Sequence, residues 1–281
     1  MRIPDKWFLV AAALWCCCSG IAAGARDRVP VHLWRLDCGE LRVDDLNDYS
    51  DSGAYRGKSM QFVVSCYLIQ HGQSYMLWDT GLPVSDLGAA VSGPDARDET
   101  LAITIVTQLQ TLGVMPDQIT EIGISHYHLD HTGQAESFPQ ARLFIGEADL
   151  EVLRRPESAH RARPLLHWLD TGGSLDAVDG DRDIYGDGSV VMLNLPGHTP
   201  GHHGLLVRLA KTGTVLLSGD AVHFRENYES RDMPAQNTSR AESLASIDRL
   251  RSLVVHLSAM LIIQHDPRDV SKLPKFPAAA Y

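Results

Sequence analysis

The residues best suited to chemistry stand together in one stretch, Ser125-His126-Tyr127-His128-Leu129-Asp130-His131-Thr132-Gly133. Four of them can bind a metal ion: His126, His128, Asp130 and His131. Imidazole and carboxylate groups together suit a borderline divalent ion such as zinc. A single histidine in an apolar setting is usually a packed core residue, but four potential ligands at this spacing predict a metal site.

The flanking residues predict how these side chains are aimed. The apolar run Ile122-Gly123-Ile124 is typical of the end of a buried strand, and Gly133 permits a sharp exit of the chain. A helix would spread the four side chains around its circumference. We therefore expect a tight loop, which can aim them at one point.

Three further candidate ligands follow apolar runs that we predict to be strands. His198 follows Ser189–Leu195, Asp220 follows a hairpin made of Leu205–Leu209 and Thr214–Leu217, and His265 follows Met260–Ile263. Parallel or mixed sheets gather functional groups at strand ends, so we expect all the candidates at one sheet edge.

Seven ligands are enough for two ions. His126, His128 and His198 suit one ion, Asp130, His131 and His265 suit the other, and the carboxylate of Asp220 can bridge both. Asp79, at the end of the predicted strand Ser74–Trp78, can orient a ligand histidine or bond only within its own turn. His202 and His203 are weaker candidates because they follow His198 within a turn.

The remaining pattern predicts one domain over residues 26–281. Strands are expected at Val31–Leu36 and Phe62–Ile69, and helices at Thr100–Leu112, Glu147–Arg154 and Ser239–Leu257. The segments 82–98 and 156–183 show no clear periodicity, and we expect them to supply the walls of a pocket. The formal charge of −10 argues against a nucleic-acid partner.

The start of the chain has the features of a secretory signal. Arg2 and Lys6 precede the apolar run Trp7–Cys18, and Ala23-Gly24-Ala25 fits a cleavage site. We expect a signal peptide over residues 1–25, a periplasmic or secreted mature protein, and no stable membrane anchor after cleavage. The alternative is an uncleaved anchor.

Two cysteines remain after that cleavage, Cys38 and Cys66. Each lies in or beside a predicted strand, and the two strands could pair in antiparallel fashion. In an oxidising compartment these cysteines can form a disulfide. Two buried thiols explain the residues equally well.

The candidate ligands together resemble those of the metallo-β-lactamase superfamily. The set His126-x-His128-x-Asp130-His131 with His198, Asp220 and His265 carries the likeness, as do the segments Gly197–His202 and Ser218–Asp220. The resemblance implies an α+β fold, an αββα sandwich, and a hydrolase with two Zn²⁺ per chain.

Within that superfamily the chain is most similar to the N-acyl homoserine lactonases. The segments Asp79–Gly81, Gly219–Glu229 and Gln264–Asp266 carry this second likeness. Those lactonases often place a tyrosine three residues after the bridging aspartate, where it contacts the substrate carbonyl. Here that position is His223, which can still donate a hydrogen bond.

The leading hypothesis is therefore a lactonase for a small-molecule lactone or ester. A hydroxide bridging the metals attacks the ring carbonyl. Asp130 and His223 are the predicted catalytic residues: Asp130 passes a proton to the leaving alkoxide, and His223 assists at the carbonyl oxygen.

Three alternatives stay open. The first is a thioesterase like glyoxalase II, although that group usually carries a C-terminal helical segment and this sequence ends 16 residues (281 − 265) after His265. The second is a β-lactamase, although those enzymes generally lack the aspartate present at Asp220. The third is a secreted metal-binding protein without activity.

Overall fold

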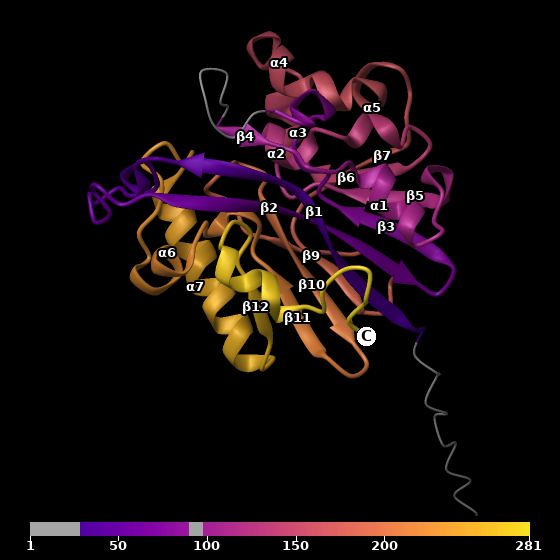
Figure 1. Ribbon diagram of the computed structural model, residues 1–281. Helices are drawn as coiled ribbons and strands as arrows, with labels where there is room; N and C mark the ends of the chain where they lie inside the picture. The colour runs from indigo at the N-terminus through magenta and orange to yellow at the C-terminus, as the bar shows by residue number, and fades with distance from the viewer. Residues whose placement is uncertain (1–28, 90–97) are drawn as a thin grey trace, which may run out of the picture.

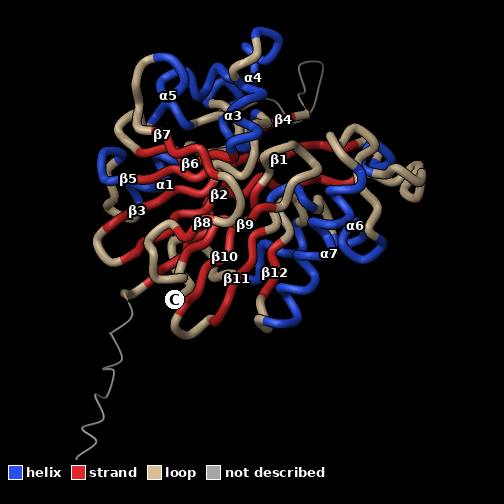
Figure 2. The backbone as a smooth tube through the Cα atoms, turned by 180° about the vertical axis from the view of Figure 1, so that it is seen from behind, coloured by secondary structure: helices blue, strands red, loops and turns tan. Residues whose placement is uncertain are grey.

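The computed structural model describes residues 29–89 and 98–281 of the chain. In this part, two β-sheets pack face to face and helices cover both outer faces (Figures 1 and 2). The predicted αββα sandwich is confirmed. The predicted signal peptide, residues 1–25, lies outside the described residues.

The first sheet has seven strands in the order β4-β1-β2-β3-β5-β6-β7. Their bounds are Val31–Val43 for β1, Met60–His71 for β2, Ser74–Trp78 for β3, Glu99–Thr100 for β4, Ile119–Gly123 for β5, Arg142–Gly146 for β6 and Leu175–Val178 for β7. Strands β3, β5, β6 and β7 run parallel, whereas β1 pairs antiparallel with β2 and β4, and β2 with β3. The parallel half carries the carboxyl ends from which functional loops emerge.

The second sheet has five strands in the order β12-β11-β10-β9-β8. Their bounds are Arg182–Asp183 for β8, Val190–Asn194 for β9, His203–Leu209 for β10, Gly213–Leu217 for β11 and Met260–Ile262 for β12. The predicted hairpin is confirmed as β10 and β11, which pair antiparallel, and β12 runs parallel to β11.

The helices divide between the two outer faces (Figure 1). Those of the first sheet's side are α1 (Ile105–Thr111), α2 (Leu129–Thr132), α3 (Glu147–Leu153), α4 (Ala159–Ala162) and α5 (Leu166–Asp170). Those of the second sheet's side are α6 (Arg225–Ser230) and α7 (Arg240–His256). None of the helices in the described ranges is long and apolar enough to cross a membrane.

Three apolar layers hold the sandwich together. Between the sheets, Trp78 and Ile69 of the first sheet belong to the same buried cluster as Val207 and Leu217 of the second. A second cluster joins the outer face of the first sheet to α1 and α3, and a third joins the second sheet to α7. Burial of such side chains contributes roughly 1.5–3 kcal/mol each, so the strand ends form a rigid platform.

Two local predictions need correction. The helix predicted over Thr100–Leu112 begins only at Ile105, because the side chain of Thr104 caps it by accepting the Thr107 N–H at 3.2 Å. The loop predicted over the ligand stretch is also partly wrong, since Leu129–Thr132 forms the one-turn helix α2.

Gly133 serves a different purpose from the one predicted. Its φ of −59° is helical, so it does not need the conformational freedom of glycine. A Cβ atom at this position would instead lie 2.3 Å from the backbone nitrogen of Pro83. Glycine is required because the loop after β3 packs directly against the end of α2.

Cys38 of β1 and Cys66 of β2 are joined by a disulfide, with their Cα atoms 5.8 Å apart. Of the two possibilities left open by the sequence, the disulfide is therefore the one the structure has. Both residues are fully buried in the cluster beneath α1.

Candidate metal centre

Each candidate ligand follows the carboxyl end of a strand, as predicted. His126 and His128 lie in the loop after β5, and Asp130 and His131 lie on α2 directly behind it. His198 follows β9, Asp220 follows β11 and His265 follows β12. The structure brings all seven side chains together in two neighbouring groups.

The first group consists of His126, His128, His198 and Asp220. The Nε2 atom of His198 lies 3.2 Å from Nε2 of His126 and 3.1 Å from Nδ1 of His128. Oδ2 of Asp220 lies 3.4 Å from the same His198 atom. Four ligand atoms therefore surround one point.

The second group consists of Asp130, His131 and His265. Nε2 of His131 lies 3.4 Å from Oδ2 of Asp130 and 3.4 Å from Oδ1 of Asp220. Nε2 of His265 lies 3.1 Å from that same Asp220 oxygen. The two carboxylate oxygens of Asp220 thus face different groups, which is the geometry that a bridging ligand needs.

The donor atoms fit divalent metal ions. In tetrahedral zinc with Zn–N bonds of about 2.0–2.1 Å, ligand nitrogens stand roughly 3.3 Å apart, close to the separations in the first group. Nε2 of His131 and Oδ1 of Asp220 are buried without a hydrogen-bond partner among the described residues. Buried polar atoms left unpaired in this way are costly unless an ion or water binds them.

The pKa values of the histidines in the first group favour the binding of a cation. Burial lowers the pKa of His126, His128 and His198, most strongly for His126 and His198. These imidazoles are therefore neutral at physiological pH, and neutral imidazole is the form that ligates metals.

The second group holds charges of both signs. Burial opposes a charged imidazole at His131, but the carboxylates of Asp130, Asp220 and Asp79 outweigh it and raise the pKa of His131 well above its usual value. Burial likewise opposes ionisation of Asp220, but the imidazoles of His265 and His131 hold its pKa well below the usual value. Bound cations can take over the role of these protons.

Comparisons with known proteins agree with this geometry. A family model described as "Metallo-beta-lactamase superfamily" matches residues 60–260. The chain belongs to the metallo-beta-lactamase superfamily. It is a metal-dependent hydrolase of that superfamily's lactonase-like group.

The relatives cover nearly the whole chain. An N-acyl homoserine lactonase AttM from Agrobacterium fabrum (strain C58 / ATCC 33970) is 31% identical over 271 residues, which is 88% of this chain and 99% of the relative. An N-acyl homoserine lactonase from a Bacillus species is 30% identical over 230 residues, covering 79% and 88% of the two chains. A solved structure of a quorum-quenching N-acyl homoserine lactone lactonase superposes with a TM-score of 0.74 at 26% identity, covering 90% of this chain and 98% of that one.

Asp79 supports the metallo-beta-lactamase ligand set from behind, which confirms the orienting role foreseen for it. Its Oδ2 atom lies 2.9 Å from Nδ1 of His131, and its two oxygens also accept from the N–H and hydroxyl of Ser125. Because a carboxylate only accepts hydrogen bonds, the proton of His131 is held at Nδ1 and Nε2 faces the group.

Two other supporting contacts escaped the sequence analysis. His202 is not in either group; its Nε2 atom accepts the backbone N–H of Asp220 at 2.8 Å and so fixes the bridging residue. Asp149 of α3 is fully buried and accepts from Thr199 Oγ1 at 2.8 Å and from the Gly201 N–H at 2.7 Å, which anchors the loop that carries His198. An isolated aspartate in a helix carries no local signal of such a role.

His223 lies beside the groups but belongs to neither. Its Nε2 atom is 3.3 Å from Oδ2 of Asp220, and only 3% of the residue is exposed. The ring packs against Tyr49, with 4.8 Å between centroids, and makes no hydrogen bond to the loop around Asn227. His223 thus lies directly beside Asp220, and its catalytic role stays a prediction.

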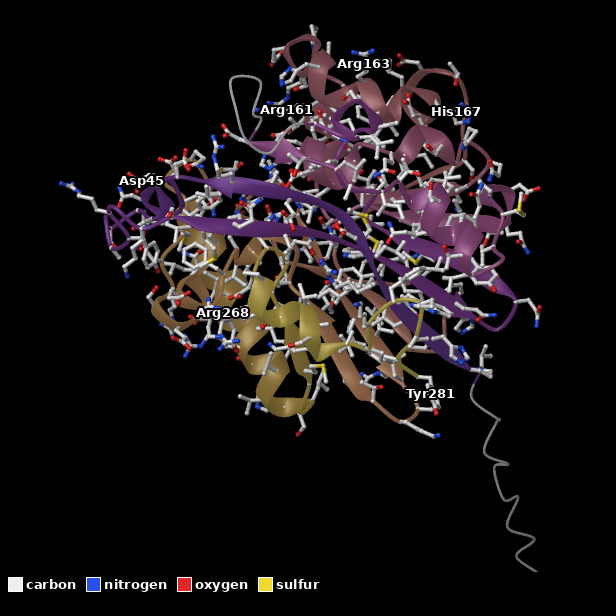
Figure 3. All side chains as sticks on the ribbon, in the orientation of Figure 1. Asp45, Arg161, Arg163, His167, Arg268 and Tyr281 are labelled. Atoms are coloured by element: carbon white, nitrogen blue, oxygen red, sulfur yellow. A yellow bond between two sulfur atoms is a disulfide. The ribbon has the colours of Figure 1, made fainter. Side chains whose placement is uncertain are left out.

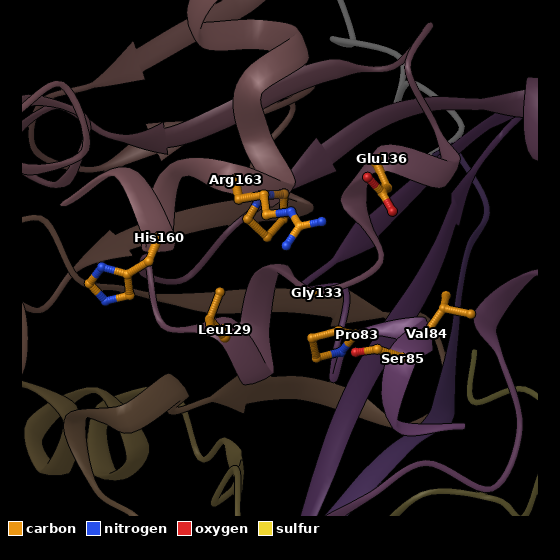
Figure 4. A pocket seen from close by; sticks show the side chains of 9 residues that line it. Pro83, Val84, Ser85, Leu129, Gly133, Glu136, His160 and Arg163 are labelled. Carbon is orange, nitrogen blue, oxygen red and sulfur yellow. The ribbon is translucent and has the colours of Figure 1, made fainter. Parts of the chain in front are cut away.

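A pocket of about 490 Å³ opens beside α2 (Figure 4). Its lining includes Pro83, Val84, Arg163 and Pro164, together with Leu129, the residue directly before Asp130. Both segments that the sequence left unassigned, 82–98 and 156–183, contribute to this wall, as expected. The side chain of Asp130 is 18% exposed, more than those of His131, Asp220 and His265, so it is the carboxylate that an incoming molecule can reach.

Proposed function

We propose that the protein is a dinuclear zinc lactonase that opens the ring of N-acyl homoserine lactones. The observation that carries the proposal is the two-sided placement of Asp220, whose oxygens each face one group of ligand atoms. Its relatives over almost the whole chain are N-acyl homoserine lactonases, and one similar structure has the product N-hexanoyl-L-homoserine bound at its catalytic metal center.

Two zinc ions held by these seven residues would supply a hydroxide at neutral pH and polarise the ester carbonyl. The chain's own residues do the rest. Asp220 holds the two groups in register, and Asp79 fixes the orientation of His131. Asp130, whose carboxylate is more exposed than that of Asp220, delivers a proton to the alkoxide that leaves when the ring opens.

His223 is the proposed donor to the carbonyl oxygen as negative charge develops there. It lies three residues after Asp220 and contacts that carboxylate without being needed as a ligand. The apolar wall formed by Leu129, Val84 and Pro83 suits the acyl chain of the substrate, and Arg163 can pair with polar groups at the pocket rim.

Hydrolysis of a lactone series that varies in acyl length tests this function, with a thioester and a β-lactam as competing substrates. We expect the zinc-loaded protein to open the lactones at far higher kcat/KM than it cleaves the other two. A preference for the thioester or the β-lactam, or no hydrolysis with two zinc ions bound, contradicts the proposal. Elemental analysis should approach two zinc ions per chain.

We further propose that the mature protein is periplasmic or secreted. The amino-terminal segment has the features of a signal peptide, and the Cys38–Cys66 disulfide suits an oxidising compartment. Terminal sequencing of exported protein should begin near Arg26. Full-length protein confined to the cytoplasm contradicts this proposal.

A further inference from the structure

A tyrosine that the ligand pattern does not include lies over the centre. Tyr49 ends a short 3₁₀ helix, Leu46–Tyr49, in the long loop between β1 and β2. Its ring meets the ring of His223 edge-on at 4.8 Å and the ring of Phe62 at 4.9 Å. Phe62 in turn stacks on His265, with 5.4 Å between centroids.

The layering gives Tyr49 the outer position. His223, Phe62 and His265 are each at most 3% exposed, whereas Tyr49 is only partly buried. Of these four rings, the one most open to solvent is therefore that of Tyr49, directly against His223. The loop begins near Asp45, which projects at one end of the sandwich in Figure 3.

This tyrosine is held in place by contacts from a distant part of the chain. Its backbone carbonyl accepts a hydrogen bond from Nδ2 of Asn227 in α6 at 3.0 Å, and Asn227 is buried. The next residue, Ser50, donates its hydroxyl to Asp232 at 2.5 Å, and the Asp51 N–H bonds the same carboxylate. These bonds anchor the backbone of Tyr49, and the ring contacts with His223 and Phe62 orient its side chain.

The hydroxyl of Tyr49 is available as a donor. It makes no hydrogen bond to any residue within 29–89 or 98–281. Burial, reinforced by the nearby carboxylates of Asp220 and Asp130, raises the pKa of Tyr49 above its usual value, so the phenol keeps its proton.

We propose that Tyr49 is a further catalytic residue, whose phenol donates a hydrogen bond to the ester carbonyl oxygen of the substrate beside His223. The inference rests on the proposed lactonase function and adds a donor to it. No bond of Tyr49 is broken: the proton stays on the phenol while negative charge builds on the carbonyl oxygen, and the hydrogen bond strengthens in the transition state. The tyrosine thus comes from the β1–β2 loop rather than from the segment after Asp220.

The first test compares Tyr49→Phe with Tyr55→Phe on the zinc-loaded enzyme. Both changes remove one hydroxyl from the same loop, but the hydroxyl of Tyr55 is already bonded to Ser230 at 3.0 Å and its ring packs on Phe224. We expect Tyr49→Phe to lower kcat by roughly 100-fold, with KM, zinc content and melting temperature near those of the wild type. Tyr55→Phe should keep the wild-type kcat.

Two kinetic results overturn the inference. One is a Tyr49→Phe variant whose kcat stays within about threefold of the wild type, since losing an oxyanion donor typically costs far more. The other is a loss that appears in KM alone, because a contact made equally to substrate and transition state does not raise kcat.

The second test does not depend on lactone turnover. Protein containing 3-fluorotyrosine is loaded with zinc, and the fluorine resonance of Tyr49 is identified by its disappearance in Tyr49→Phe. Adding acetate, a simple carboxylate that presents oxygen to the metal groups, should shift the Tyr49 resonance and leave that of Tyr55 unchanged. An unshifted Tyr49 resonance overturns the proposed contact.

The two tests separate the possible failures. If the wild type opens no lactone but acetate shifts the Tyr49 resonance, the proposed substrate is wrong, whereas the contact of Tyr49 with an oxygen ligand at the metal groups stands. Suppose instead that the wild type opens lactones, that Tyr49→Phe is fully active, and that acetate does not shift the Tyr49 resonance of the wild type. The lactonase function then stands, and the role proposed for Tyr49 is wrong.

Discussion

Replacing Asp79 by asparagine should weaken zinc binding at the second group without unfolding the protein. The carboxylate is fully buried and accepts three hydrogen bonds, from His131 at 2.9 Å and from the N–H and hydroxyl of Ser125 at 2.7 and 2.9 Å. Asparagine has the same shape and tolerates the positive φ of 58° found here. The substitution removes the negative charge and replaces one acceptor oxygen by an NH₂ donor.

Asp79→Asn should change which ring nitrogen of His131 carries the proton. An amide has one acceptor oxygen, so if that oxygen keeps the backbone N–H of Ser125, its NH₂ group faces Nδ1 of His131. The imidazole then has to accept at Nδ1 and carry its proton on Nε2, the atom that faces Asp130 and Asp220. A protonated Nε2 cannot bind a metal ion.

The size of the effect can be stated in advance. Loss of such a supporting partner typically costs 10- to 100-fold in metal affinity, which is about 1.4–2.7 kcal/mol. Competition with a chelator should show one zinc ion weakened by this factor in Asp79→Asn and the other nearly unchanged. Asp187→Asn is the matched control, because Asp187 pairs with His71 at 2.8 Å at a site apart from both groups. Two wild-type zinc affinities in Asp79→Asn would refute the reasoning.

Three further changes test other parts of the structure. Replacing Cys38 and Cys66 together by alanine should lower the free energy of unfolding by about 3–4 kcal/mol, because the disulfide closes a loop of 28 residues; reducing agent should then no longer affect the melting temperature. Burial raises the pKa of Asp149 to about 7, so between about pH 4 and 7 the folded state holds a proton that the unfolded state has lost. The free energy of unfolding of the wild type should therefore fall as pH rises through this window. Denaturant unfolding at several pH values should show a smaller fall for Asp149→Asn. His223→Ala should reduce kcat at unchanged zinc content, and His223→Tyr should restore it, whereas a lowered melting temperature with normal kcat would leave His223 only a packing role.

The ligand set could be predicted from the sequence because each ligand is tied to a strand that is itself readable. His198, Asp220 and His265 come within a few residues of short apolar runs, and the ends of packed strands meet at one edge. The apolar runs therefore predicted not only the strands but also where the following side chains would lie. Asp79 was foreseen for the same reason, since it follows β3 directly.

Local capping decided the two details that were wrong. Thr104 starts α1 later than the apolar stripe suggested, and α2 forms within a stretch too short for helical periodicity to appear. A one-turn helix still brings Asp130 and His131 to the same group because both lie shortly after the carboxyl end of β5. The pattern of ligand types was informative there, whereas the expected backbone conformation was not.

The substrate side of the centre follows different rules from the metal side. Tyr49 reaches the site through a hydrogen bond to a residue 178 positions away, and the pocket wall combines Val84 with Arg163 from a separate segment. No local pattern encodes such contacts, because loops pack where the rest of the fold leaves room for them. Strand ends therefore position the ligands of this metal-dependent hydrolase, whereas residues of separate loops line the pocket beside α2. It follows that exchanging residues of the pocket wall such as Val84 should change the preferred acyl length while two zinc ions remain bound. Changes at Asp79 should instead weaken zinc binding and leave the preferred acyl length unchanged.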